Sequence, residues 1–409
     1  MGVRWLGLAL LAACSFHGPN ASVLDAPPGT GPDAAGPPVD AGPPADAITT
    51  CAATDVVAGR FHTCARRADG YVWCWGGNSH GEAGTAPISD TVNCPVYPHA
   101  CLRLPQHVAM PPVSALALGI SDTCLIAGTA TYCLGADDAQ QFGDNAAGDA
   151  HAPRIVPLRA SSSAIAIGDQ HTCSISATRQ DVECSGPNSY GEVGDNTGMV
   201  RGVPTAAMLT GTPTAIGVGY NHSCAIIASR VWCWGSNEQL QLSPSSSAVP
   251  FQFPIMVPGL TTATAVAGGD HHTCAVLADK TARCWGAGGY GQLGDGSFPN
   301  AAAQLDTVDL TDIVVIRPGL IHTCALTGSG GVYCWGSGFA AAAGGAGHPV
   351  RITLPAGAVS VAGGGEHDCA ALVDGTVWCW GSNDHGQLGD GTTTSPATRG
   401  TAVKAKLCM

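Results

Sequence analysis

Histidine and cysteine recur in this chain at a spacing that could serve metal binding, nucleophilic chemistry or crosslinking. One copy, HTCALTGSGGVYCWG, runs from His322 to Gly336 and places Cys324 and Cys334 ten positions apart. Imidazole and thiolate are zinc ligands, and an activated thiolate is a nucleophile. The same two sulfurs, joined to each other, would form a disulfide within a hairpin. A single copy does not separate these readings.

The motif occurs seven times, which is the decisive observation. The other copies are HTCARRADGYVWCWG from His62, DTCLIAGTATYCLG from Asp122, HTCSISATRQDVECSG from His171, HSCAIIASRVWCWG from His222, HTCAVLADKTARCWG from His272 and HDCAALVDGTVWCWG from His367. Successive first cysteines are 60, 49, 51, 50, 50 and 45 residues apart. A period near fifty, made of short apolar strands and glycine turns, is typical of a four-stranded propeller blade.

Each copy predicts a β-hairpin that positions its two cysteines. A short apolar strand precedes the motif, as at residues 265–269 and 359–363. Asp-Gly pairs such as Asp69-Gly70 supply the positive φ of a tight turn between the two arms. Cysteines on facing arms have Cα atoms about 4.5–5.5 Å apart, within reach of a disulfide.

Cysteine pairing accounts for all but one of the nineteen cysteines. Seven pairs, separated by 9 to 11 positions, lie in the hairpins: Cys64 with Cys74, Cys124 with Cys133, Cys173 with Cys184, Cys224 with Cys233, Cys274 with Cys284, Cys324 with Cys334 and Cys369 with Cys379. Cys94 and Cys101 are expected to pair locally within an insertion. Cys51 precedes the first hairpin cysteine by 13 residues and Cys408 follows Cys369 by 39, so the two flanks together make one period. A bond between Cys51 and Cys408 would therefore close a ring.

Metal binding and catalysis find less support than disulfides. Structural zinc sites usually have Cys-x₂₋₄-Cys spacing and four ligands, whereas this motif supplies three. No metal, cofactor or catalytic residue is therefore predicted. We expect the histidines to form a repeated hydrogen bond within or between blades: His62, His171, His222, His272, His322 and His367. Aspartates that follow glycine are expected to stabilise turns, with calcium binding as the alternative: Asp144, Asp195, Asp295 and Asp390.

Alternating tryptophans point one ring into each of three blades and the other outward. The pairs are Trp73 with Trp75, Trp232 with Trp234 and Trp378 with Trp380. Successive strand residues face opposite sides of a sheet, so one ring of each pair is predicted in the core. The other ring could line an aromatic surface for a ligand.

The N-terminus predicts export and a lipid anchor. Residues 1–13 carry one positive charge and a short apolar run, which is typical of a signal peptide. Their end, Leu11-Ala12-Ala13-Cys14, resembles a bacterial lipobox, in which the peptide is cut before a cysteine that is then acylated. An incidental cysteine beside an ordinary cleavage site is the alternative. Residues 14–50 are rich in Pro, Gly and Ala and are predicted to be an unfolded linker, followed by the propeller at 51–409.

Composition narrows the compartment and the partners. Charged residues make up only 11% of the 409 residues, the formal charge is −13, and no Lys/Arg cluster is present, so nucleic acid is not an expected partner. Nineteen cysteines indicate an oxidising compartment outside the cytoplasm. Together with the lipobox, they place the protein in a bacterial cell envelope, at the outer membrane.

The repeats resemble the RCC1 repeat, named for the eukaryotic regulator of chromosome condensation. Residues 359–391 match the family pattern, including His367, Trp378-Cys379-Trp380-Gly381 and Gly386-Gln387-Leu388-Gly389. The resemblance implies an all-β, seven-bladed β-propeller. Copies that depart from it have Asp122 in place of His, Leu134 and Ser185 in place of Trp, residues 239–242 in place of Gly-Gln-Leu-Gly, and Phe339 followed by alanines.

The expected function is non-catalytic binding of a protein or a glycan at the envelope, through propeller loops or a propeller face, by a monomer. The family's nucleotide exchange on the nuclear GTPase Ran is not carried over to an exported chain. Secreted bacterial propellers of this type that inhibit β-lactamases are a nearer analogue. The alternatives are an envelope hydrolase or lyase, with Glu366 and His367 as scattered candidates, and a structural envelope component.

Overall fold

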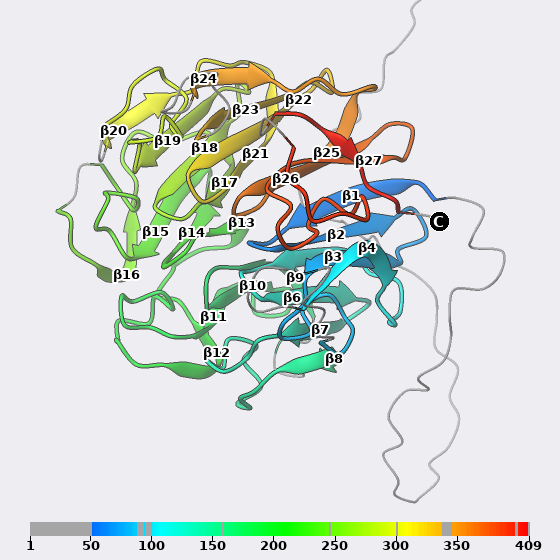
Figure 1. Ribbon diagram of the computed structural model, residues 1–409. Helices are drawn as coiled ribbons and strands as arrows, with labels where there is room; N and C mark the ends of the chain where they lie inside the picture. The colour runs from blue at the N-terminus through cyan, green and yellow to red at the C-terminus, as the bar shows by residue number, and fades with distance from the viewer. Residues whose placement is uncertain are drawn as a thin grey trace, which may run out of the picture.

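The protein folds into seven four-stranded antiparallel sheets, arranged as the blades of a propeller (Figure 1). The computed structural model describes residues 51–87, 94, 100–156, 159, 161–244, 247–299, 302–337, 346–396 and 400–407, without the side chains of 302–304, 306 and 307. This architecture confirms the prediction of an all-β, seven-bladed propeller. Within the described ranges, no helix is long and apolar enough to cross a membrane.

Each blade consists of four strands that are consecutive in the chain, with the first strand nearest the axis. The first strands are β1 (Ala53–Ala58), β5 (Ala115–Leu118), β9 (Ser162–Ile167), β13 (Pro213–Val218), β17 (Ala263–Gly268), β21 (Ile313–Pro318) and β25 (Ala358–Gly363). The second strands are β2 (His62–Arg67), β6 (Asp122–Ala127), β10 (Thr172–Ser176), β14 (His222–Ile227), β18 (His272–Leu277), β22 (His322–Thr327) and β26 (His367–Leu372). The third strands are β3 (Val72–Gly77), β7 (Ala130–Gly135), β11 (Val182–Gly186), β15 (Arg230–Gly235), β19 (Ala282–Gly286), β23 (Val332–Gly336) and β27 (Val377–Gly381). The outer strands are β4 (Cys101–His107), β8 (Ala150–Ile155), β12 (Arg201–Ala206), β16 (Phe251–Met256), β20 (Ala302–Thr307), β24 (Ala346–Arg351) and β28 (Val403–Lys404).

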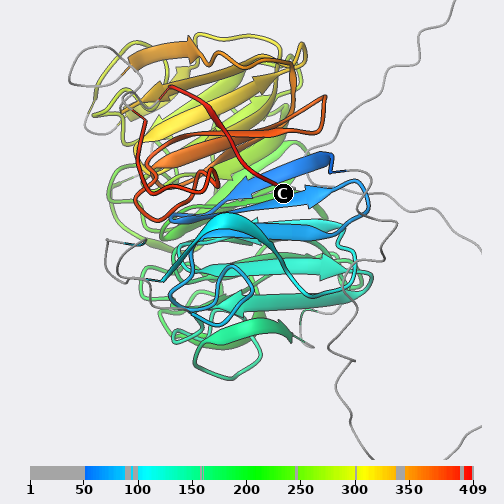
Figure 2. The ribbon, with the colours of Figure 1, turned by 45° about the vertical axis from the view of Figure 1, so that its right-hand side comes forward.

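The ring closes where the first blade meets the seventh. β1 packs against β25 and β26, although these segments lie about three hundred residues apart in the chain (Figures 1 and 2). Across this seam Ser360 donates a hydrogen bond to the Asp55 carboxylate at 2.7 Å. Because each sheet uses consecutive strands only, the described strands close the ring by side-by-side packing and not by strand exchange.

The hairpin cysteines face each other as predicted. The second and third strands of every blade pair so that the two cysteines are direct partners, as Cys324 and Cys334 are in β22 and β23. Their Cα atoms are 4.0–4.1 Å apart, closer than the separation expected for an unbridged pair. Each bond therefore crosslinks two central strands of its blade.

All seven hairpin disulfides are present, one in each blade. They join Cys64 with Cys74, Cys124 with Cys133, Cys173 with Cys184, Cys224 with Cys233, Cys274 with Cys284, Cys324 with Cys334 and Cys369 with Cys379. All fourteen of these cysteines are buried, with at most 1% of each residue exposed. Their sulfurs therefore belong to the blade cores, and none is a free thiolate that could bind a metal or attack a substrate.

The remaining cysteines are placed in part. Cys94 and Cys101 form the expected local disulfide. Cys51 is disulfide-bonded, but its predicted partner Cys408 lies outside the described residues, as does Cys14. Every cysteine in the described part of the chain is therefore oxidised.

The glycine of each Cys-Trp-Gly motif shapes the blade. Gly336 has a φ of 100°, and the pairing of β23 with β24 shifts register between Cys334 and Gly336. This is a β-bulge, for which glycine supplies the positive φ. A Cβ at Gly336 would also meet the backbone of Ile321 and His322 closer than 3.0 Å. The motif therefore encodes a bulge and a close backbone approach.

Tryptophan side chains fill the space between neighbouring blades. Trp285 of the fifth blade is fully buried and packs against Val231, Cys233 and Leu242 of the fourth. Trp234, Trp335, Trp75 and Trp380 occupy corresponding clusters. The prediction that one ring of each tryptophan pair is core is confirmed by Trp75, Trp234 and Trp380.

We predict that non-reducing peptide mapping of the purified protein recovers Cys51 linked to Cys408. The phase of the repeats places both residues at the meeting point of the first and seventh blades. The intra-blade crosslinks serve as internal controls, because each should appear as a fragment joining residues nine to eleven positions apart. Recovery of Cys51 on any other cysteine would overturn the ring-closure argument.

Candidate functional site at the propeller axis

Seven glycines form a closed ring around the axis, one from the end of each first strand. They are Gly59, Gly119, Gly168, Gly219, Gly269, Gly319 and Gly364. A Cβ at any of them would lie closer than 3.0 Å to the carbonyl oxygen of the ring glycine in the next blade, and the seventh faces the first. Real Cβ atoms do not approach carbonyl oxygens this closely. Glycine is thus required wherever neighbouring blades meet at the axis.

In the first, third, fourth, fifth and seventh blades, the residue after the ring glycine donates a backbone hydrogen bond to the next blade. Arg60 N donates to Gly119 O at 3.1 Å, and Tyr220 N donates to Gly269 O at 3.1 Å. Gly365 N donates to Gly59 O at 3.2 Å across the closing seam. These bonds fix the backbone at the axis, so that chemical variety there comes from the side chains.

The motif histidines join each blade to the next, as the sequence predicted. Nε2 of His222 lies 2.8 Å from Oγ1 of Thr273 in the following blade. The same hydroxyl donates to Gln241 O at 2.7 Å, and Trp285 Nε1 donates to that carbonyl at 2.8 Å. Because the hydroxyl has a single proton, its bond to the carbonyl requires His222 Nε2–H to be the donor. Histidine, hydroxyl and tryptophan therefore converge on one carbonyl between blades.

Four other interfaces repeat this link through a hydroxyl. The pairs are His62–Thr123, His171–Ser223, His272–Thr323 and His367–Thr63, at 2.7–2.9 Å. Burial lowers the pKa of His62, His171, His222, His272 and His367 to about 3. The neutral ring that the hydrogen bond needs is therefore the stable form at neutral pH.

The sixth interface replaces the hydroxyl with a carboxylate. His322 Nε2 lies 2.8 Å from Oδ1 of Asp368, and both side chains are buried. Together with Cys324 they form the only group of three potential metal ligands in the described residues. The Cys324 sulfur is bonded to Cys334, so it is not available as a thiolate ligand. The geometry supports a hydrogen-bonded pair at this position.

The interface between the second and third blades lacks the link. Asp122 stands where histidine stands elsewhere, and burial raises its pKa well above the ordinary value. Neither its carboxylate oxygens nor Thr172 Oγ1 has a hydrogen-bond partner among the described residues. The shorter aspartate side chain does not bridge the gap that an imidazole spans in the other blades.

An arginine compensates for the missing tryptophan at this same interface. Ser185 replaces the ring, and the guanidinium of Arg159, fully buried, bonds its hydroxyl. Arg159 also donates to Thr172 O at 2.8 Å, to Ser174 Oγ at 2.8 Å and to Phe142 O at 2.9 Å. Burial lowers the Arg159 pKa to about 9. A polar network here fills the position that an indole ring occupies in other blades.

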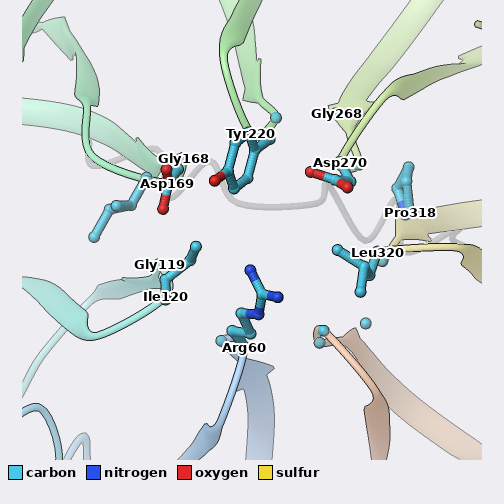
Figure 3. A pocket seen from close by; sticks show the side chains of 18 of the residues that line it. Arg60, Gly119, Ile120, Gly168, Asp169, Tyr220, Gly268, Asp270, Pro318 and Leu320 are labelled. Carbon is cyan, nitrogen blue, oxygen red and sulfur yellow. The ribbon is translucent and has the colours of Figure 1, made fainter. Parts of the chain in front are cut away.

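A cavity of about 130 Å³ opens at the axis over the glycine ring (Figure 3). All seven blades line it, each through the end of its first strand. The backbone here is nearly repeated, but the residue after the ring glycine varies among the blades, with aspartate occurring twice: Arg60, Ile120, Asp169, Tyr220, Asp270, Leu320 and Gly365. We call these seven residues and the cavity the axial mouth.

Charges are divided across the axial mouth. Asp169, Tyr220 and Asp270 come from three consecutive blades, and Arg60 extends toward the axis from the opposite side (Figure 3). Burial raises the pKa of both Asp169 and Asp270, while Arg60 acts against this rise. The Tyr220 hydroxyl points toward the Asp169 carboxylate (Figure 3) and also opposes the rise in its pKa. The guanidinium of Arg60 has no hydrogen bond or ion pair within the described residues; it lies over the Phe61 ring, 5.4 Å from its centroid.

The propeller face that carries the axial mouth also carries the long loops between third and fourth strands. Antiparallel order places these loops at the same end of each blade as the turns between first and second strands. We call this side the loop face. On it the third to fifth blades expose large apolar side chains, each 45–66% exposed: Met199, Val200, Val249, Phe253, Tyr290 and Phe298. A groove lined by Ser189, Asn196 and residues 250–253 lies among them, between the third and fourth blades.

Other residues singled out from the sequence take structural positions. Asp195 and Asp390 accept hydrogen bonds from Thr197 and Thr392 in their turns, and Asp295 does so from Ser297. Asp144 accepts from the Ala146 amide and pairs with Arg154 at 2.9 Å. The turn role predicted for these aspartates is confirmed.

The second tryptophans are half-buried on their blades and do not gather into one aromatic surface. Arg67 lies over the Trp73 ring, 4.6 Å from its centroid, and Trp378 Nε1 donates to Thr376 at 3.1 Å. Glu366 and His367 are not brought together as an acid–base pair. Glu366 is exposed, whereas His367 is buried and bonded to Thr63.

The sequence prediction missed the axial mouth, although one signal was present. The position after the ring glycine varies in charge and size, while its neighbours repeat from blade to blade. Residues that repeat from blade to blade form the framework. Residues that vary at one fixed position of each repeat, after the ring glycine, are the side chains that meet at the axis. Arg159 gave no such signal, because it lies outside the repeated motif, whereas Ser185 was recognised as a departure from the motif tryptophan.

Comparisons with known proteins agree with the fold. Two family models, both described as the regulator of chromosome condensation (RCC1) repeat, match residues 53–82, 263–292 and 358–387, and residues 229–276. These segments lie in the first, fourth, fifth and seventh blades. The chain therefore carries RCC1 repeats. Comparison with curated proteins found no match.

Solved RCC1-like propellers share the architecture. The chain is similar to Prp20p of Saccharomyces cerevisiae, with a TM-score of 0.70 and 17% identity over 87% of this chain and 88% of that one. It is also similar to human WBSCR16, with a TM-score of 0.67 and 19% identity over 78% and 86%. The yeast protein was described with its binding properties to Gsp1p and histones. At these identities the likeness shows the fold alone.

We predict that replacing His222 with Gln makes stability less sensitive to acid. The folded-state pKa lies near 3 and the unfolded value near 6.5, so the unfolded chain binds the proton first. The contribution of His222 is present above pH 6.5 and is lost as pH falls toward 3. Between pH 7 and pH 5 the unaltered protein should lose about 2 kcal/mol more than His222→Gln, by denaturant unfolding at each pH.

His348→Gln is the matched control for this measurement, because His348 is exposed and makes no buried link between blades. The burial argument would be wrong if His222→Gln and His348→Gln had the same pH dependence. Comparing variants at each pH cancels the opposing contributions of buried acids such as Glu192, whose pKa burial raises to about 7.

Proposed function

We propose that this RCC1-repeat propeller is an exported, lipid-anchored binding protein that holds a protein partner on its loop face. In the structure, the residues that join the blades repeat around the ring, whereas the side chains on the loop face differ from blade to blade. The proposal adds to this fold a compartment, an anchor and a partner class.

The exposed apolar side chains on the loop face carry the proposal for a protein partner. Met199 and Val200 of the third blade are 66% and 58% exposed, and Tyr290 of the fifth is 50% exposed. Exposed apolar side chains gathered on one region of a soluble surface indicate an interaction site. They lie on the same three blades that place Asp169, Tyr220 and Asp270 at the axial mouth. A protein is favoured over a glycan because the aliphatic side chains Met199, Val200 and Val249 are exposed there beside the three aromatic ones.

Similar propellers support this partner class. Yeast RCC1 (Prp20) has been solved bound to Kap60, with 18% identity to this chain and a TM-score of 0.69 over 86% of this chain and 85% of that one. A protein of this architecture that has been solved with a bound protein partner supports a protein as the partner of the present one.

The oxidised cysteines support export. All seventeen cysteines in the described part of the chain are disulfide-bonded, and such density is rare in reducing compartments. The signal peptide at 1–13, the acylated Cys14 and the linker at 14–50 lie outside the described residues and rest on the sequence. In the proposed arrangement the linker holds the propeller away from an outer membrane.

The hydrolase or lyase reading has less support. Its candidate His367 is buried, with Nε2 committed to Thr63 at 2.7 Å and its pKa lowered to about 3. A general base must be reachable by substrate and have a pKa near the working pH. His367 meets neither requirement.

We predict that Cys14 carries the lipid. When the full chain is expressed in a Gram-negative host fed an alkyne fatty acid, the protein should take up the label and enter the membrane fraction. Cys14→Ala should lose both properties, and Ser15→Ala should keep them. Labelling of Cys14→Ala, or an unlabelled soluble wild-type protein, would contradict the anchor.

We predict that a photocrosslinking residue on the loop face captures the partner in producing cells. Positions 253 and 290 are exposed on the fourth and fifth blades and should yield one common protein adduct. Position 373 is the control, because Val373 is 68% exposed in the turn between β26 and β27 on the opposite face. Equal capture from position 373, or no capture from positions 253 and 290, would contradict the proposal that the loop face binds the partner.

A further inference from the structure

The axial mouth presents opposite charges that the protein does not pair with each other. Arg60 comes from the first blade, and Asp169 and Asp270 come from the third and fifth (Figure 3). No ion pair between Arg60 and either aspartate is present in the described structure, although each affects the other's electrostatic environment. All three side chains are half-buried. Unpaired opposite charges that face one cavity match a ligand carrying both a positive and a negative group.

Part of the backbone around the cavity is already hydrogen-bonded. Gly59 O, Gly119 O and Gly269 O accept hydrogen bonds from the neighbouring blades. The amides of Arg60, Tyr220 and Gly365 are the donors in these bonds. Recognition of a charged ligand therefore depends on the side chains, which carry the charges and differ between blades.

Two neighbours flank the aspartates. The Tyr220 hydroxyl points toward the Asp169 carboxylate (Figure 3). His271 Nε2 lies 3.7 Å from Asp270 Oδ2, and the His271 ring contacts the Tyr220 ring with centroids 6.0 Å apart. The two carboxylates thus lie on either side of Tyr220 (Figure 3).

The rest of the lining is apolar. Ile120 and Leu320 occupy the equivalent positions of the second and sixth blades, and Pro318 lies beside Leu320 (Figure 3). A purely cationic ligand would meet the like charge of Arg60, and a purely anionic one would meet two carboxylates. A small zwitterion with an aliphatic group satisfies all three charges and the apolar wall.

We propose that the axial mouth binds a free aliphatic α-amino acid. Its ammonium group lies between Asp169 and Asp270, its carboxylate accepts hydrogen bonds from the Arg60 guanidinium, and its side chain contacts Ile120 or Leu320. The cavity of about 130 Å³ is open on one side, so a side chain the size of that of leucine fits with its end toward solvent. This ligand is separate from the protein partner, which the apolar loops contact.

Isothermal titration calorimetry on the full, oxidised protein tests the proposal with L-leucine as the probe. L-Leucinamide lacks the carboxylate, and N-acetyl-L-leucine lacks the ammonium group. We expect L-leucine to bind and each analogue to bind at least about tenfold more weakly, since each leaves one side of the site unpaired. Equal binding of leucinamide would show a cation site, equal binding of acetyl-leucine an anion site, and no binding of leucine no site; each result overturns the proposal.

Variants separate the axial mouth from the rest of the surface. Arg60→Gln and Asp270→Asn should each weaken leucine binding about tenfold or more, whereas Arg230→Gln and Asp138→Asn, at exposed positions outside the mouth, should not. Unchanged affinity in the first two variants would contradict the assignment. If either variant fails to fold, the analogue series on the unaltered protein still tests whether the site recognises both the ammonium group and the carboxylate of leucine. Photocrosslinking at positions 253 and 290 is an independent readout, so the failure of one proposal leaves the other testable.

Discussion

The structure depends on the close approach of backbone to backbone at the axis. Each ring glycine faces the carbonyl oxygen of the next, and a single methyl group at Gly219 or Gly269 would drive two blades apart. Such contact leaves no room for side chains between the ends of the first strands. The backbone amides of Arg60, Tyr220 and Gly365 then bond across the blades, and the charged side chains that line the axial cavity are those of residues that follow the glycines.

Farther from the axis, hydrogen bonds among a histidine, a hydroxyl and a tryptophan join neighbouring blades. A neutral imidazole bonds a hydroxyl on the next blade, and that hydroxyl bonds a carbonyl that an indole also reaches, as at His222, Thr273 and Trp285. The same atoms join the seventh blade to the first, through His367 and Thr63. The link that closes the ring is thus the same link that joins most of the other blades. Disulfides strengthen each blade internally, whereas this network holds blades to one another.

Departures from the repeat divide into two kinds. At the second interface Asp122 and Ser185 replace motif residues, and Arg159 fills the space with hydrogen bonds, so the change is compensated within the framework. At the axial mouth and on the loop face the variable side chains have no such compensation. Arg60 remains unpaired, and Met199 and Phe253 are exposed. A ligand or partner would contact these unpaired or exposed side chains, which differ between blades.

The repeat pattern predicted the blade count, the hairpins and their seven cysteine pairs, together with a repeated histidine hydrogen bond within or between blades. These predictions follow from local features: a period near fifty, Cys-Trp-Gly at a bulge, and cysteines at facing positions of two arms. The packed ring was needed to show that the histidine bond joins neighbouring blades, that Arg60, Asp169 and Asp270 share one cavity and that Arg159 replaces an indole ring. Ring closure brings together residues at one phase of different repeats. Their distance from one another depends on how the blades pack and not on any local stretch of chain.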